Sequence, residues 1–241
     1  ESRDVKIQAW LKRVKSPTGG EVPVLYLDTD IEGNQPEDRA ITDHLYGGDN
    51  SYRLKQEIVL GIGGARILTA LGFRIRKYHM NEGHAALLTL ELLNRTRRPV
   101  EDTWDERNSW DISKVTRQCV FTTHTPVAAG HDRFSYDLVE KILGEEIPFF
   151  LLKDLAGKDE LNMTLLALNL SRYVNGVAKK HGEVSQAMFP GFEIHAITNG
   201  YSNGHTDGYV YTNLHANCHI NPNGNSHRNS DSIADTIRNL H

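Results

Sequence analysis

Segments with the composition of β-strands alternate with segments of helical periodicity through most of this chain. Apolar runs of strand length occupy 73–79, 117–123 and 193–198, and each is followed by a polar loop. Apolar residues at helical spacing predict helices at 52–71, 85–93, 137–143, 162–173 and 174–188. Strands that alternate with helices predict an α/β fold with a mostly parallel sheet and functional loops at the carboxyl ends of its strands.

The first 50 residues predict a hairpin followed by a polar segment. Apolar and polar residues alternate over 5–9, as in a strand, and 15–21 has the composition of a turn. Residues 22–27 read as a second strand, the antiparallel partner of the first. The polar stretch 28–50 is expected to form either a long functional loop or a short irregular segment.

Two residues predict the limits of helices. Gly72 follows the first helical stretch, where a glycine commonly ends a helix. Asn81 precedes the stretch 85–93 and is expected to serve as its N-cap.

Composition limits the classes of protein. The formal net charge of −4 over 241 residues does not suggest a general binder of nucleic acid or of anionic membranes, and neither partner is expected. No apolar run approaches the roughly 20 residues of a membrane span, and no signal-peptide pattern precedes the first strand. Cys119 and Cys218 make no disulfide framework, and Cys119 is expected to be a reduced, buried thiol. Since the chain opens at Glu1, within a strand, we expect a cytoplasmic protein cut from something longer.

Three junctions between a strand and a loop concentrate polar groups. They are Asn81-Glu82-Gly83-His84, Thr123-His124-Thr125-Pro126 and Thr198-Asn199-Gly200. Because the carboxyl ends of parallel strands lie along one edge of a sheet, these loops are expected to converge on one crevice. Amides, carboxylates and imidazoles suit a sugar, whose hydroxyls need both donors and acceptors. The alternative for each junction alone is a helix cap or a satisfied turn.

Other motifs are less informative. The run 61–64 (GIGG) lies within a helical pattern and lacks the third glycine of a dinucleotide fingerprint. His79, Glu82 and His84 do not have the spacing of a zinc-protease helix. His215, Cys218 and His219 lack a second pair of ligands at zinc-finger spacing, so no metal site is expected.

The composition changes after Gly200. Residues 201–241 hold 8 Asn and 5 His and no Lys. We therefore expect a partial domain at 1–200 and an atypical Asn- and His-rich tail at 201–241, disordered or read from a shifted frame.

Five separated motifs stand in the order found in the α-glucan (glycogen or maltodextrin) phosphorylases, and the chain resembles that family from about residue 22 to 200. The motifs are RLKQE at 53–57, YHMNEGH at 78–84, FTTHTPVAAGH at 121–131, VNGVA at 174–178 and TNG at 198–200. The forms NEGH and THTPVAAGH resemble the shorter bacterial and archaeal branch. The resemblance implies an incomplete Rossmann-like N-terminal domain of a two-domain (GT-B type) glycosyltransferase.

The resemblance also implies roles for residues at two of the junctions. Glu82 and His84 fall beside the glucosyl unit, and His124 and Thr125 fall where the family holds the sugar ring and its 6-hydroxyl. We take Glu82, His84 and His124 as catalytic, with Thr125 and Asn81 as substrate-binding. Glucosyl transfer passes through an oxocarbenium-like state, which oriented dipoles and hydrogen bonds stabilise. Asn175 and Gly176 are expected at a helix junction. Arg53 and Gln56 either face the site or lie on a solvated face of a helix, and we favour the solvated face.

The implied reaction is phosphorolysis of an α-1,4-glucan to glucose 1-phosphate. Its cofactor, pyridoxal phosphate, would be bound in a missing C-terminal domain and by no residue of this chain, so the chain alone is expected to be inactive. The implied partners are glucan, phosphate, glucose 1-phosphate and, for the parent protein, a second copy as a homodimer. The alternatives are a nucleotide-sugar glucosyltransferase of the glycogen-synthase kind and a non-catalytic glucan-binding remnant.

Overall fold

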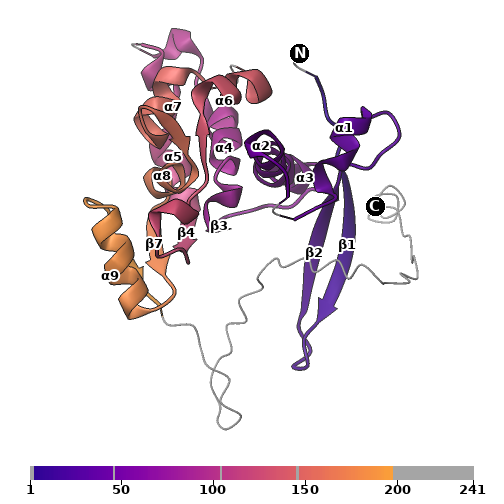
Figure 1. Ribbon diagram of the computed structural model, residues 1–241, viewed down its shortest axis with the longest axis horizontal. Coiled ribbons are helices and arrows are strands. Elements are labelled where there is room, and N and C mark those ends of the chain that lie inside the picture. The colour runs from indigo at the N-terminus through magenta and orange to yellow at the C-terminus, as the bar shows by residue number, and fades with distance from the viewer. Residues whose placement is uncertain (1–2, 46, 104, 145–146, 198–241) are drawn as a thin grey trace. The chain divides into compact units, whose positions relative to one another are not determined.

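The computed structural model describes residues 3–45, 47–103, 105–144 and 147–197, which fall into two compact units (Figure 1). The smaller unit comprises residues 3–47, and the described part of the larger one runs from 48 to 197. The predicted boundary at 200, the tail and the third junction (Thr198-Asn199-Gly200) lie outside the described residues. None of the described helices is long and apolar enough to cross a membrane.

The smaller unit is built on an antiparallel hairpin. Strand β1 (Gln8–Lys15) pairs with β2 (Glu21–Asp28), which confirms the predicted turn and second strand. The strand predicted at 5–9 is wrong in its limits. Asn34 explains this, because its side chain bonds both the N–H and the C=O of Lys6, at 2.9 and 2.8 Å, in place of a partner strand. The polar stretch that follows forms α1 (Pro36–Arg39) and a 3-10 turn (Ala40–Thr42).

The larger unit contains the parallel sheet that the sequence predicts. Its four strands stand in the order β3-β4-β7-β8, and every neighbouring pair is parallel. They are β3 (Tyr78–Asn81), β4 (Cys119–Thr123), β7 (Tyr173–Gly176) and β8 (His195–Ala196). A short antiparallel pair, β5 (Arg133–Ser135) with β6 (Glu160–Asn162), lies outside this sheet and was not predicted.

Helices follow or precede each strand of the sheet. The α-helices are α2 (Asn50–Ile58), α3 (Gly64–Ala70), α4 (Leu88–Thr96), α5 (Ile112–Gln118), α6 (Tyr136–Leu143), α7 (Phe149–Ala156), α8 (Met163–Asn169) and α9 (Lys179–Met188). A π-helical turn (Val59–Gly63) joins α2 to α3, and 3-10 turns cover Gly83–Ala85, Val100–Asp102, Arg107–Ser109 and Ala128–Gly130.

Several predicted elements are confirmed and others are wrong. The helix predicted at 52–71 is continuous through the π turn and ends at Gly72, whose φ is 77°. The strand predicted at 73–79 begins only at Tyr78, and the strand predicted at 117–123 begins at Cys119, after α5. Asn81 is not a helix cap, because it ends β3 and α4 begins at Leu88.

The segment predicted as a helix at 174–188 begins as strand β7. Asn175 and Gly176 therefore lie inside the sheet, between β4 and β8, and not at a helix junction. A short apolar run shows too few residues for its periodicity to distinguish a buried strand from a helix. Only the pairing of β7 with β4 and β8 shows that this segment is a strand.

One hydrophobic core fills the larger unit. Its largest fully buried side chains come from both the sheet and the helices, such as Met80 in β3, Phe121 in β4 and Leu93 in α4. Cys119 is buried and free, as predicted. Gly61, in the π turn, packs directly on the start of α4, where an added Cβ would lie 2.8 Å from the main-chain nitrogen of Leu88.

Gly61→Ala is expected to lower the free energy of unfolding by about 1–3 kcal/mol, because the added methyl group meets backbone that cannot move aside. The measurement is urea unfolding followed by circular dichroism. Gly20→Ala is the control, since its new Cβ would meet nothing closer than Ser16 Cβ at 3.8 Å. Equal stability of Gly61→Ala and the unmodified chain would show that the two helices do not pack as closely as described.

Candidate functional site

Glu82 joins the ends of two neighbouring strands. It follows β3, and its main-chain N–H donates to the carbonyl of Thr122 in β4 at 2.9 Å. Its carboxylate oxygen Oε1 accepts a hydrogen bond from the main-chain N–H of His124 and another, at 3.2 Å, from the hydroxyl of Thr125. Two of the three predicted junctions therefore converge, as the parallel pairing of β3 and β4 requires.

The backbone of Glu82 is strained. Its φ and ψ are 64° and 176°, and in the described part of the chain it is the one non-glycine residue with positive φ. This region of φ and ψ is essentially restricted to glycine, and holding another residue there costs about 1–3 kcal/mol. The contacts with Thr122, His124 and Thr125 hold the residue in place. Such strain is typical of functional sites, where it fixes the direction of a side chain.

Gly83 lets the chain turn sharply from Glu82 to His84. It is buried against α8, and an added Cβ would lie 3.1 Å from Met163 Cβ and 3.2 Å from the main-chain nitrogen of Thr164. No larger residue fits there without moving α8. The turn therefore directs Glu82 and His84, two residues apart, into adjoining groups of polar side chains.

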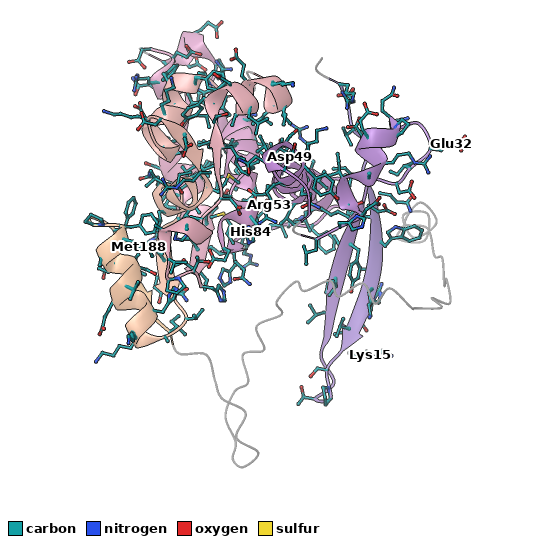
Figure 2. The ribbon with its side chains drawn as sticks, viewed as in Figure 1. Lys15, Glu32, Asp49, Arg53, His84 and Met188 are labelled. Atoms are coloured by element: carbon teal, nitrogen blue, oxygen red, sulfur yellow. The ribbon has the colours of Figure 1, made fainter. Side chains whose placement is uncertain are left out.

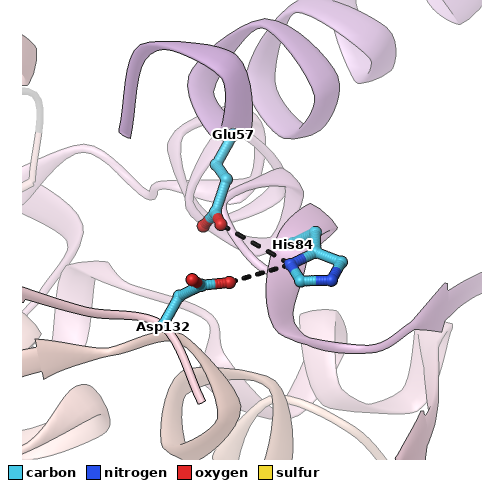
Figure 3. Close-up of side chains that lie close together, drawn as sticks. All are labelled: Glu57, His84 and Asp132. Atoms are coloured by element: carbon cyan, nitrogen blue, oxygen red, sulfur yellow. Dashed lines mark hydrogen bonds and ion pairs between the residues drawn. The ribbon is translucent and has the colours of Figure 1, made fainter. Parts of the chain in front are cut away.

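His84 belongs to a partly buried network of titratable and charged groups, in which Glu57 is the buried member (Figure 3). Its Nδ1 lies 2.9 Å from Asp132 Oδ2, 3.6 Å from Glu57 Oε1 and 2.8 Å from Arg53 Nη2. Figure 2 shows Arg53 and His84 next to one another in the larger unit. Arg53 also donates to Asp132 at 3.0 Å, and its Nε lies 3.2 Å from Glu57 Oε1.

The network sets the protonation states of its members. Burial raises the pKa of Glu57 to about 8, opposed by His84 and reinforced by the nearby charge of Asp132. Burial would lower the pKa of His84, but the contacts with Asp132 and Glu57 outweigh it and raise that pKa to about 9. For Asp132, burial is outweighed by hydrogen bonds from His84 and Arg53, which hold its pKa well below its usual range. The raised pKa of His84 favours a charged imidazole, in which the Nδ1–H donates to Asp132. The contact of Nδ1 with Arg53 Nη2, at 2.8 Å, requires Nδ1 to accept instead, because a guanidinium only donates, so the two contacts belong to different protonation states of the ring.

Glu57, His84 and Asp132 also have the composition of a cation site. One ligand atom from each lies within 4.8 Å of the others. However, the Arg53 guanidinium lies 3.2 Å from the Glu57 carboxyl and 3.0 Å from that of Asp132. Because this guanidinium occupies the space beside both carboxyl groups, a metal ion would have to displace it.

A second polar chain crosses the sheet from β3 to β7. The hydroxyl of Thr122 donates to Asn175 Oδ1 at 2.9 Å, and His79 Nε2 lies 2.7 Å from the same hydroxyl. A hydroxyl has one hydrogen to donate, so Nε2 of His79 must carry the proton in that contact. Asn175 thus stabilises β4, the strand whose Thr122 carbonyl accepts the N–H of Glu82.

The structure brings some of the predicted site residues into contact and leaves others apart. Glu82, His124 and Thr125 contact one another, His84 lies in the adjoining network, and Asn81 is exposed at the end of β3. The prediction that Arg53 lies on a solvated face is wrong, since only 15% of its side chain is exposed. Glu57 and Asp132 were missed, although both stand in or beside quoted motifs (RLKQE and AGH), where acids near Arg53 and His84 were a usable signal.

The structure described so far is an α/β unit with polar groups at the carboxyl edge of a parallel sheet. Comparisons with known proteins show which family has such a unit. No family model matches the chain. Glycogen phosphorylase of Mycobacterium tuberculosis is 36% identical over 225 residues, covering 81% of this chain and 25% of that protein. Maltodextrin phosphorylase of Thermococcus litoralis is 41% identical over 174 residues, covering 70% of this chain and 20% of that protein.

A third relative, glycogen phosphorylase of Aquifex aeolicus, is 33% identical over 187 residues, 70% of this chain. The chain spans about a quarter or less of the length of these three relatives, which is 25%, 20% and 25%. The chain is therefore homologous to one segment of the glycogen and maltodextrin phosphorylases, as the resemblance predicted.

Asp132→Asn is expected to lower the free energy of unfolding at pH 7 by about 1–3 kcal/mol, because Arg53 and His84 lose the anion that they share. The depressed pKa of Asp132 means that this contribution is complete above about pH 4 and is lost as the pH falls further. Urea unfolding at pH 7 and at pH 3 measures both effects.

Asp154→Asn is the control, since its ion pair with Arg107 is half exposed, at 61% for Arg107 and 51% for Asp154. We expect its stability to change by about 0.5 kcal/mol or less. An Asp132→Asn variant as stable as this control at pH 7 would contradict the role of Asp132 in the network.

Proposed function

We propose that this chain forms one wall of the glucosyl-binding site of an α-glucan phosphorylase, which transfers a glucosyl unit from an α-1,4-glucan to phosphate and yields glucose 1-phosphate. The homology to glycogen and maltodextrin phosphorylases over 70–81% of the chain supports this. The observation that carries the proposal is the carboxylate of Glu82, held on strained backbone against His124 and Thr125 at the carboxyl edge of the sheet.

In the proposed site the sugar lies over the ends of β3 and β4. The fixed negative charge of Glu82 stabilises the positive charge that develops at the anomeric carbon in an oxocarbenium-like transition state. His84, held as a cation by Asp132, donates to sugar oxygens. His124 and Thr125 hold the ring, and Asn81, exposed beside Glu82, adds a donor and an acceptor for hydroxyls. Because these groups are fixed before substrate binds, they cost little reorganisation during the reaction.

The pyridoxal phosphate implied by the resemblance does not fit the described residues. This cofactor binds a lysine as a Schiff base. Every lysine in the described part of the chain is exposed or half-buried, and none lies among the buried polar groups. We therefore propose that residues outside the described part hold it, within a second domain of GT-B type, and that the 241-residue chain alone lacks phosphorolytic activity. We also propose that the parent protein forms a homodimer and that it is located in the cytoplasm.

The longest product of the gene that contains this sequence is expected to release glucose 1-phosphate from maltoheptaose and phosphate. Glu82→Gln is expected to reduce kcat by about 10²–10³-fold, since the amide keeps the shape of the side chain but removes the charge. Glu91→Gln is the control, because Glu91 is also a buried acid but bonds Arg66 and Arg95, at 2.7 and 2.9 Å.

A coupled assay for glucose 1-phosphate measures both variants. Failure of the unmodified protein to release glucose 1-phosphate would overturn the proposed reaction. Equal activity of the Glu82 and Glu91 variants would overturn the role of Glu82 alone.

A further inference from the structure

The first turn of α8 contacts both of the segments that meet at Glu82. On one side, the main-chain nitrogen of Thr164 lies against Gly83, where an added Cβ would be 3.2 Å from it. On the other side, the main-chain N–H of Met163 donates to the carbonyl of Asp132 at 3.1 Å. The turn after β3 and the end of the loop after β4 therefore pack on the same support, which belongs to neither strand.

Thr164 reaches both segments by itself. Its hydroxyl forms a hydrogen bond of 2.8 Å with Nδ1 of His131, the last residue of the loop 124–131. Both partners are buried, since Thr164 is 1% exposed and His131 is 7% exposed. The other ring nitrogen of His131, Nε2, is buried and has no hydrogen-bond partner among the described residues. Within the described part of the chain, the bond to Thr164 is thus the one hydrogen bond that fixes this imidazole.

The start of the same loop is held by Glu82. Its carboxylate accepts hydrogen bonds from the main-chain N–H of His124 and from the hydroxyl of Thr125. The loop is also closed on itself, because Thr125 packs on Gly130, where an added Cβ would lie 2.5 Å from Thr125 Cγ2. A displacement at the end of the loop therefore reaches Thr125 and its contact with Glu82.

Many buried threonines serve only the stability of their own helix. Thr89 is of this kind, since its hydroxyl donates to the carbonyl of Ala86, three residues before it, at 2.7 Å. The bond between Thr164 and His131 differs, because it joins residues 33 positions apart and links α8 to the loop after β4.

We propose that Thr164 is a positioning residue, which through its bond to His131 and its contact with Gly83 holds the loop 124–131 against the carboxylate of Glu82. The strained backbone of Glu82 needs such support, because a residue at positive φ keeps this conformation only where its surroundings hold it. Without the bond to Thr164, the loop opens more often, and the N–H of His124 then leaves the carboxylate. The use of Glu82 in sugar binding rests on the proposed function, whereas the support of the loop by Thr164 does not.

The test is amide hydrogen exchange, followed by NMR, in the 241-residue chain and in Thr164→Val, which removes the hydroxyl and keeps the shape of the side chain. We expect the amides of His124 and Gly130 to exchange about 5–30-fold faster, the factor that one buried hydrogen bond contributes. The amide proton of His124 should also move upfield, because it loses its carboxylate acceptor for part of the time. Thr164→Ser, which keeps the hydroxyl, should restore both the rates and the signal.

Thr89→Val is the matched control. Thr89 is 0% exposed, so this change also removes a buried hydrogen bond. Its bond links nothing to the loop, so exchange at His124 and Gly130 should not increase relative to exchange at Phe121, in the middle of β4.

His131→Phe removes the same bond from its other end. The new ring keeps the edge-to-face contact with Phe189, whose centroid lies 5.4 Å from that of His131. Because Thr164→Val and His131→Phe break one and the same bond, the double variant should exchange no faster than either single variant. A double variant in which the two effects multiply would show that the residues act independently, against the proposal.

Loop exchange in Thr164→Val no faster than in Thr89→Val would overturn the role of Thr164, and so would exchange in Thr164→Ser as fast as in Thr164→Val. His131→Phe tests the bond even if Thr164→Val does not fold, since unchanged exchange at His124 would contradict the proposal equally. No sugar is present in these measurements, so they are separate from the proposed reaction. The expected exchange rates with no release of glucose 1-phosphate by the parent protein would overturn only the proposed function.

Discussion

The register between β3 and β4 is the constraint on which the site depends. Asn81 lies opposite Thr122, so the residues that follow each strand, Glu82 on one side and His124 on the other, emerge at the same level. The bond from the Glu82 N–H to the Thr122 carbonyl continues this register past the end of β3. A shift of one residue would direct the Glu82 carboxylate to the other face of the sheet. The parallel pairing therefore brings together groups that are about 40 residues apart in the chain.

The second feature of the site is the way it accommodates buried charge. An isolated ionised group inside a protein is expensive, and such groups shift their pKa or find partners. Around His84 both happen, because Asp132 is shared by two cations while Glu57, more deeply buried, retains its proton to about pH 8. Glu82 and His84, which belong to two adjoining groups of polar side chains, are separated in the chain by one buried glycine, Gly83.

Much of this site could be predicted from the sequence, and the errors have identifiable causes. The junctions after 79 and 123 were recognised because polar groups follow apolar strands, a local pattern. Arg53 was misplaced because its sequence neighbours on α2 suggest a solvated face, whereas its partner Asp132 lies 79 residues away. Asn175 was placed at a helix junction because a buried strand of four residues carries no periodicity of its own.

Three features followed from the amino-acid sequence without any structure: the α/β class, the end of the first long helix at Gly72, and the homology to one segment of the glycogen and maltodextrin phosphorylases. These depend on local patterns and on motif order, which are properties of the chain in one dimension. The grouping of Glu57, Arg53 and Asp132 around His84 and the positive φ of Glu82 became visible only in the folded chain. The reason is physical: burial and charge–charge distances, which set both strain and pKa, exist only once remote segments have packed together.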